Sequence, residues 1–312
     1  MLITDCAPGV QAPQPAAPAA RAYTPLQEIE PGLLVKFECN NPGGSHKMRA
    51  ARAIVQAALA SGQIVKGRTT VIEKTGGNFG YGLAVACAEI GVPVELAVGL
   101  GFSPIKRRCL ELFGARLIGV AMLEAGATPR EVVEHHLAHA HALGKSYFYT
   151  DQFYNPGSVQ AHELETAVEI AAQLKDWPAL ETVLLVACAG TGASLTGITR
   201  GLRRAGYRTQ VILVEPLGCD SRNGVFVSHA LEGMAVGVQA PLLDWSLVDE
   251  VIRVDQASML ATQNSFAGTH GYFVGNTSAA CLAVARQVAG RAHPTRKILT
   301  LMYDHGLWYI KP

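Results

Sequence analysis

The amino-acid sequence predicts an α/β protein of two lobes, each an open, mostly parallel sheet with helices on both faces. Short apolar runs rich in β-branched residues alternate with longer segments whose apolar residues recur at helical spacing. This alternation is typical of buried parallel sheets joined by crossover helices. The length of 312 residues exceeds what one core usually fills, and 49% hydrophobic residues supply enough apolar surface for two.

The expected elements follow from these runs in chain order. The predicted strands are residues 33–37, 70–73, 94–98, 115–120, 183–187, 211–214, 251–254 and 298–302. The predicted helices are residues 47–61, 80–90, 105–113, 129–143, 158–174, 195–205 and 278–289.

The joint between the two lobes is expected near residue 150. Residues 40–150 would form a smaller N-terminal α/β domain, and residues 23–39 together with 151–312 would form a larger one. Residues 1–22 include a stretch rich in proline and alanine and are predicted to be a flexible arm.

Composition and charge exclude several classes of protein. The formal net charge is +1, so no nucleic-acid partner is expected. No apolar run reaches the ~18 residues of a membrane helix, and the N-terminus lacks the pattern of a secretory signal. The 7 cysteines are scattered without a Cys-x-x-Cys pair, as is typical of reduced thiols. These features predict a cytoplasmic protein with no membrane partner.

Three glycine-rich loops follow predicted strands, where open sheets bind their ligands. The first, residues 41–47, brings Lys47 to the first turn of a helix. The helix dipole and neighbouring groups disfavour a positive charge there, so Lys47 is a candidate nucleophilic amine that forms a Schiff base. An ordinary solvated lysine is the alternative.

The second loop begins at Thr75 and opens the next helix. Gly76 and Gly77 let the backbone approach a ligand closely, and the amide of Asn78 offers both a donor and an acceptor. A tight turn into the helix would explain the same residues.

The third loop is a candidate phosphate cradle. It combines glycines, hydroxyls and a helix N-terminus in the run Gly190, Thr191, Gly192, Ala193 and Ser194. A dinucleotide site is a rival, with Glu215 as the ribose-binding acid, but Gly197 falls two places too late for that fingerprint.

Two other clusters are interpreted as ordinary helix surfaces. Glu131, His135 and His139 recur every four residues, yet no further ligand group is evident, so no metal is predicted. The basic run 106–108 is expected to lie on a solvated helix face.

Taken in order, residues 36–47, 75–78 and 190–194 resemble the cysteine synthase and cystathionine β-synthase group of fold type II pyridoxal-phosphate enzymes, whose fold is like that of the tryptophan synthase β subunit. The resemblance implies pyridoxal 5'-phosphate as the cofactor and Lys47 as its Schiff-base lysine. It also implies that Asn78 contacts the phenolic oxygen of the cofactor, that Thr75, Gly76 and Gly77 receive the substrate carboxylate, and that residues 190–194 hold the phosphate.

Later motifs extend the resemblance. Gln152 lies in a Gln-Phe-x-Asn-Pro motif and is implied to approach the substrate. Asn276 and Thr277 are alternatives for the contact with the pyridine nitrogen. The Val-Glu-Pro motif at residues 214–216 removes the dinucleotide interpretation of Glu215, and residues 304–309 match the closing motif.

Three residues depart from the family pattern. Gly76 and Phe79 stand where the family has hydroxyl residues, which removes two donors to the substrate carboxylate. We therefore expect the other end of the substrate to be held elsewhere, by Gln152 or by groups near His229. His46 precedes the lysine, either as a proton-transfer group or as a hydrogen-bond partner of the helix N-terminus.

The resemblance implies β-replacement or β-elimination on a β-substituted amino acid, such as an O-activated serine, through an aminoacrylate. The partners are then an amino-acid substrate and a nucleophile, and the protein is expected to be a homodimer. The alternatives are a serine or threonine dehydratase-type ammonia lyase and a non-catalytic phosphate or nucleotide binder of the same fold.

Overall fold

The computed structural model describes residues 22–75 and 77–310 and contains two sheets. The strands are β1 (Leu26–Glu30), β2 (Leu33–Lys36), β3 (Thr69–Lys74), β4 (Val94–Ala97), β5 (Ala115–Leu117), β6 (Ser146–Tyr149), β7 (Thr182–Cys188), β8 (Arg208–Pro216), β9 (Glu250–Val254) and β10 (Arg296–Leu301). The helices are α1 (Lys47–Ala60), α2 (Asn78–Ile90), α3 (Pro104–Leu112), α4 (Val120–Glu124), α5 (Pro129–Ala138), α6 (Gly157–Ala161), α7 (Ala167–Gln173), α8 (Ala193–Arg204), α9 (Gln256–His270) and α10 (Asn276–Gln287).

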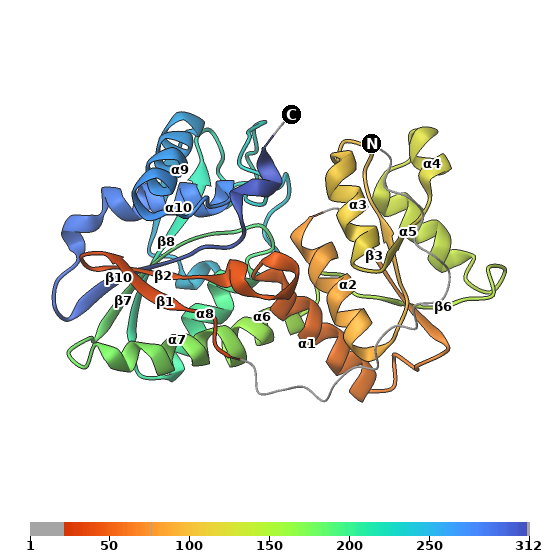
Figure 1. Ribbon diagram of the computed structural model, residues 1–312, viewed down its shortest axis with the longest axis horizontal. Helices are drawn as coiled ribbons and strands as arrows, with labels where there is room; N and C mark the ends of the chain where they lie inside the picture. Colours follow the sequence, from red (N-terminus) through yellow and green to blue (C-terminus); the bar gives the residue numbers. More distant parts are fainter. Residues whose placement is uncertain (1–21, 76, 311–312) are drawn as a thin grey trace.

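The larger sheet has the strand order β1-β2-β10-β7-β8-β9. Only β1 runs antiparallel to its neighbour; the other pairs are parallel. In Figure 1, α9 and α10 lie on one side of this sheet and α7 and α8 on the other. Both faces are therefore covered, which explains why every residue of β7 after Thr182 is buried.

The smaller sheet has the order β5-β4-β3-β6 and is parallel throughout. Alternate side chains serve its two faces: Val71 and Leu96 pack with α1 and α2, whereas Ile72 and Ala97 pack with Val132 of α5. This sheet and its helices form the second lobe in Figure 1. The predicted α/β class with two mostly parallel sheets is confirmed.

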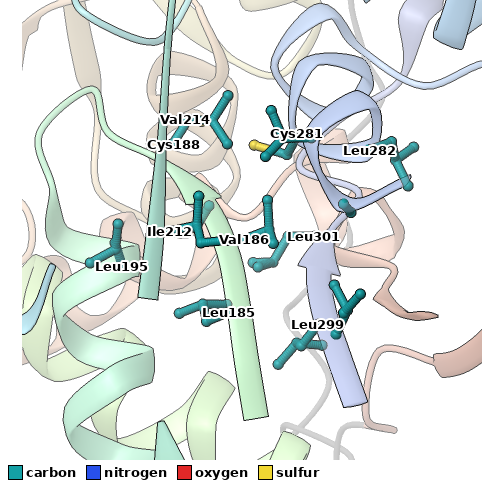
Figure 2. Close-up of a cluster of buried hydrophobic side chains, with 14 of the residues drawn as sticks. Leu185, Val186, Cys188, Leu195, Ile212, Val214, Cys281, Leu282, Leu299 and Leu301 are labelled. Carbon is teal, nitrogen blue, oxygen red and sulfur yellow. The ribbon is translucent and has the colours of Figure 1, made fainter. Parts of the chain in front are cut away.

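The main core lies between β7, β8 and β10 and the helices on either side. Figure 2 shows Val186 of β7, Ile212 of β8 and Leu301 of β10 side by side, with Leu195 of α8 and Cys281 of α10 closing the cluster. All five side chains are fully or almost fully buried. This core holds the carboxyl ends of three strands in fixed positions, and loops 189–193 and 302–305 leave from there.

Several elements differ from the sequence predictions. β1, β6, α4 and α9 were not predicted, and the strand predicted for 115–120 ends at Leu117. The helix predicted for 158–174 is interrupted by a π-helical turn at residues 162–166. Gly197 of α8 explains the close packing there, because a Cβ on it would lie 2.5 Å from the carbonyl oxygen of Val159. The predicted arm falls outside the described residues, apart from the exposed Ala22.

Among the helices of residues 22–75 and 77–310, none has the length and apolar character needed to cross a bilayer.

Candidate active site

A cavity of about 530 Å³ lies between the lobes, and the three glycine-rich loops meet in it. Most of the predicted site residues line this cavity: His46, Lys47, Thr75, Gly77, Asn78, Phe79, Gln152, Gly190, Thr191, Gly192, Ser194 and Thr277. Ala193 and Asn276 do not line it, and Gly76 lies outside the described residues.

Lys47 is the first residue of α1 and faces this cavity. Burial lowers its pKa to about 8, although the nearby Cys188 raises it. The sequence analysis predicted a lowered pKa for Lys47 from the helix dipole and neighbouring groups. In the structure, the dominant cause is desolvation of the amine by burial. An amine with this pKa is neutral in a useful fraction of molecules near pH 7 and can act as a nucleophile or a base.

Helix α1 is tied to the smaller lobe by close packing. A Cβ on Gly82 of α2 would lie 2.8 Å from the Cα of Met48, so only glycine allows the two helices to approach this closely. The contact brings the start of α1, with Lys47, next to the start of α2, with Asn78.

The same helix is tied to the larger lobe by a buried ion network. Arg49 donates to Glu38 (Nε to Oε2, 2.7 Å) and to Glu169 of α7 (Nη1 to Oε1, 2.7 Å). Lys36 of β2 also donates to Glu169, at 2.8 Å. Burial alone would raise the pKa of Glu38, but the Arg49 charge holds it below its usual value. The network therefore keeps both carboxylates charged and anchors the lysine-bearing helix.

His46 is buried beside Lys47, and its ring packs edge-on against Tyr303 with centroids 4.9 Å apart. His162 of the π-helical turn lies 5.8 Å away, centroid to centroid. Burial lowers the pKa of both histidines well below the usual value, so both rings are neutral near pH 7. The His46 side chain makes no capping hydrogen bond to α1, so its interpretation as a partner of the helix N-terminus is wrong.

The loop at residues 190–194 is a tight backbone turn at the N-terminus of α8. Gly192 has φ +89°, and a Cβ there would lie 2.4 Å from the backbone nitrogen of Leu243. A Cβ on Gly190 would lie 2.6 Å from the carbonyl oxygen of Gly233. The amides of Thr191 and Gly192 donate to no other described residue. These free donors and the helix N-terminus suit an anion.

Asn78 is held by residues of the larger lobe. Its Nδ2 donates to Oδ2 of Asp304 over 2.7 Å, and the Tyr309 hydroxyl donates to the same oxygen over 2.5 Å. Burial raises the pKa of Asp304, although these two hydrogen bonds act in the opposite direction. The Asp304 carboxylate thus fixes the Asn78 amide at the cavity wall, across the joint between the lobes.

Glu73 fixes the segment that carries Gln152 by hydrogen bonds, as Asp304 fixes Asn78. Its Oε2 accepts from the Thr150 hydroxyl at 2.5 Å and from the backbone nitrogen of Gln152 at 3.1 Å. Because Glu73 ends the buried part of β3, it fixes the 150–152 segment against the Thr75 loop.

Of the two residues considered for the pyridine contact, only one lines the cavity. Thr277 lines the cavity, whereas the Asn276 side chain is engaged outside it, donating to the carbonyl of Ala230 at 3.1 Å and accepting from Gln263 at 3.2 Å. An uncharged hydroxyl is therefore the group available at this position.

Phe79 has a structural role as well as a place in the cavity wall. Its side chain is 3% exposed and belongs to the core between α1, α2 and the smaller sheet. His229, which was expected to lie near a substrate grip, binds within its own loop: its Nε2 lies 3.2 Å from the carbonyl oxygen of Ala235. From the same loop, Glu232, Gly233 and Val236 line the cavity.

Sequence reasoning missed four charged residues of the cavity wall: Lys74, Lys106, Arg130 and Glu232. The interpretation of Lys106 as a solvated residue is wrong, because its side chain is only 14% exposed and its Nζ lies 4.7 Å from the Tyr309 ring centroid. Two signals were available: Lys74 ends β3, and Lys106 lies in the first turn of α3 after the loop that follows β4. Both residues therefore flank loops at the carboxyl ends of parallel strands, where ligands bind.

The residues considered for other ligands have local partners. Glu131 forms a capping box with Thr128 at the start of α5, and Nδ1 of His139 lies 2.8 Å from the carbonyl of His135. Oε1 of Glu215 accepts from the backbone nitrogen of Ser221 at 3.0 Å.

Comparisons with known proteins identify relatives of this chain. A family model described as pyridoxal-phosphate dependent enzyme matches residues 16–304. The cysteine synthase of Aquifex aeolicus (strain VF5) is 32% identical over 289 residues, covering 89% of this chain and 82% of that protein. The O-ureido-L-serine synthase of Streptomyces lavendulae is 29% identical and covers 91% and 86%.

A solved structure is similar over nearly the whole chain. The crystal structure of a hydrogen sulfide-producing enzyme from Fusobacterium nucleatum superposes with a TM-score of 0.79 at 27% identity, covering 92% of this chain and 95% of that chain. The sequence resemblance to the cysteine synthase group is thereby confirmed.

Proposed function

Because the chain belongs to the family of pyridoxal-phosphate dependent enzymes, we propose that it catalyses β-replacement on an O-activated serine or a similar β-substituted amino acid. In this reaction the β-substituent leaves and a nucleophile takes its place. The observation that carries the proposal is the pairing, in one cavity, of an amine of lowered pKa with a phosphate-sized backbone cradle.

The residues of the cavity fit the cofactor of the family. The cradle has free backbone donors and no room for a Cβ at Gly190 or Gly192, which suits a phosphate in close contact with the main chain. The residues that would hold pyridoxal 5'-phosphate are Lys47, Asn78, Gly190, Thr191, Gly192, Ala193, Ser194 and Thr277. When bound, the cofactor supplies an electron sink for the electron pair left at the α-carbon of the substrate.

Lys47 is the proton carrier of the proposed reaction. Its neutral Nζ takes the α-proton as the β-substituent departs with its bonding electrons, and it returns that proton to the α-carbon after the nucleophile has added to the β-carbon. The pKa of about 8 suits both directions near neutral pH, because neither protonation state of the amine is strongly disfavoured there.

Asn78 and Thr277 orient the reacting groups without changing charge. The Asp304 carboxylate fixes the Asn78 amide, and the Thr277 hydroxyl offers an uncharged partner to a ring nitrogen. Gly233 packs closely on Thr277, because a Cβ on Gly233 would lie 3.3 Å from Cγ2 of Thr277.

Thr75, Gly76, Gly77 and Gln152 are proposed to bind the substrate, with Phe79 forming an apolar part of the wall that limits water. Glu73 supports this assignment, because it fixes the backbone of Gln152 beside the Thr75 loop. The two missing hydroxyls leave fewer donors for the substrate carboxylate than the family pattern provides.

The experiment that tests the function is turnover of O-acetyl-L-serine by the purified, cofactor-loaded protein, with and without sulfide. Formation of cysteine that requires sulfide supports β-replacement. Release of keto acid and ammonia at the same rate with or without sulfide would identify a lyase instead. A protein that binds the cofactor but leaves a panel of β-substituted amino acids unchanged would contradict both activities.

We further propose a cytoplasmic homodimer with domain boundaries at residues 23–39, 40–150 and 151–312. The six described cysteines are all free thiols, which supports a reducing compartment. The dimer rests on the family resemblance, and sedimentation as a monomer at micromolar concentration would contradict it.

A further inference from the structure

The cavity wall carries more positive charge than the cofactor and the reaction chemistry require. Besides Lys47, the wall contains Lys74 at the end of β3, Lys106 in α3 and Arg130 in α5, all from the smaller lobe. Glu232 is the only acidic side chain among the described residues that line it.

Lys106 is already neutralised. Its Nζ lies 3.2 Å from Oε2 of Glu232, so this pair contributes little net charge to the cavity. The excess therefore rests on Lys74 and Arg130.

Lys74 has no carboxylate within 4.0 Å among residues 22–75 and 77–310. Its Nζ donates to the Tyr149 hydroxyl at 2.5 Å. Burial raises the pKa of that phenol, and Glu73 and Asp151 raise it further, so Tyr149 is a neutral partner. The carboxylate of Glu73 is engaged by Thr150 and Gln152.

Arg130 is paired only weakly. One of its five N–H groups meets Glu134 at 2.7 Å, in an exposed pair of the kind that contributes little binding energy. Together with Lys74, Arg130 also lines an adjoining cavity of about 350 Å³, whose wall includes the acidic Glu134 and Asp151 besides Tyr149 and Tyr154. The two cations thus stand where the two cavities meet.

The anions already assigned have other partners. The phosphate cradle belongs to the larger lobe, and the loop that begins at Thr75 is assigned to the substrate carboxylate. We propose that Lys74 and Arg130 bind a second anionic group, a carboxylate or a phosphate, carried by the leaving group or by the nucleophile. This inference rests on the proposed function, and it assigns binding groups to an anion other than the α-carboxylate of the substrate.

The test uses cofactor-loaded, full-length enzyme and reactants matched in size but not in charge. One pair is O-phospho-L-serine against O-acetyl-L-serine with the same thiol, which examines the leaving group. A second pair is mercaptoacetate against 2-mercaptoethanol with the same amino acid, which examines the nucleophile. A third pair, L-glutamate against L-glutamine, needs no turnover and is followed by the change that binding causes in the visible absorbance of the cofactor.

We expect the anionic member to be preferred in at least one pair by about 10-fold in kcat/KM or affinity, as charge-assisted hydrogen bonds predict. The double variant Lys74→Met, Arg130→Met should remove this preference while leaving kcat/KM for the neutral member nearly unchanged. The control Lys66→Met removes an exposed lysine outside the cavity and should leave the preference for the anionic member unchanged in every pair. Glu232→Gln, which frees Lys106, should strengthen the preference.

Four results separate this inference from the proposed function. Equal kcat/KM values and affinities within all three pairs, or a preference that survives the double variant, would overturn the anion site. If the double variant lost kcat/KM or affinity equally for both members of a pair, the anion site would also be overturned, because Lys74 would then be binding the α-carboxylate. A preference for glutamate over glutamine that the double variant abolishes, without any turnover, would support the anion site and contradict the proposed function.

Discussion

The two lobes build opposite walls of the same cavity by different means. The wall from the larger lobe is mainly backbone: at Gly190 and Gly192 a Cβ would come within 2.6 Å of neighbouring atoms. The wall from the smaller lobe includes long, partly exposed side chains, such as Lys74 and Arg130. The backbone wall of the larger lobe leaves no room for larger side chains, so the shape of its binding surface is fixed. In the wall of the smaller lobe, single side chains can be substituted, and ligand specificity changed, without disturbing a buried core.

Helix α1 joins the two walls. Its first residue, Lys47, faces the cavity, Gly82 of the smaller lobe packs against the backbone at Met48, and Arg49 binds Glu38 and Glu169 on the other side. The position of the Lys47 amine therefore depends on both lobes, and the predictions below examine each contribution.

Lys47→Ala should have the largest effect, because it removes the amine that both walls position. We expect the rate of β-replacement to fall by about 10²–10⁴-fold, the usual contribution of a proton-transfer group. The cofactor should also be lost on dialysis, measured by visible absorbance. Lys66→Ala is the control, and retention of the same absorbance by Lys47→Ala would contradict the assignment.

Arg49→Met should lower the free energy of unfolding by about 3–5 kcal/mol, because the buried Glu38 would lose its ion-pair partner and keep only the neutral donors Thr24 and Asn41. Urea denaturation measures this change. Arg52→Met on the same helix is the matched control: its partner Glu89 has a side chain 34% exposed, so a smaller loss is expected. Equal losses in the two variants would mean that the buried network does not anchor α1.

Gly192→Ala and Gly206→Ala compare two glycines at opposite ends of α8. Both have positive φ, +89° and +95°, so an alanine is strained at either place by about 1–2 kcal/mol. Only at Gly192 does the new Cβ also collide, with Leu243, since nothing lies within 4 Å of the corresponding position at Gly206. Cofactor affinity should therefore fall in the first variant and stay unchanged in the second, as fluorescence titration with the cofactor would report.

The pH dependence of cofactor capture examines the lowered pKa of Lys47 without any substitution. The pKa of Lys47 is lowered, so its neutral form is favoured, and capture by the apoenzyme should accelerate from pH 6 and level off above about 8. A change of about 10-fold per pH unit is expected below the pKa. Continued acceleration up to pH 10 in a stopped-flow measurement would indicate an ordinary, solvated lysine.

The best-predicted elements are those whose signal is local. β7, β8 and β10 each contain a short apolar run, at residues 183–188, 211–214 and 298–299, and the glycine-rich loops are recognisable from their residue types and from the helices that follow. β1 was missed because an antiparallel edge strand is half exposed and its sequence, Leu-Gln-Glu-Ile-Glu, is mixed. α9 was missed because only Met259, Gln263 and Phe266 of its 15 residues are buried.

The sequence by itself determined the alternation of most strands and helices, the positions of the three glycine-rich loops and the place of Lys47 at the start of a helix. Each depends on residues close together in the chain, where apolar spacing, φ preferences and helix N-termini act. Only the tertiary structure decided that desolvation lowers the pKa of Lys47, that Thr277 rather than Asn276 reaches the cavity, and that Lys74 and Arg130 share its rim. Burial, electrostatic fields and side-chain proximity depend on which distant segments pack together, and no local pattern of residues specifies them.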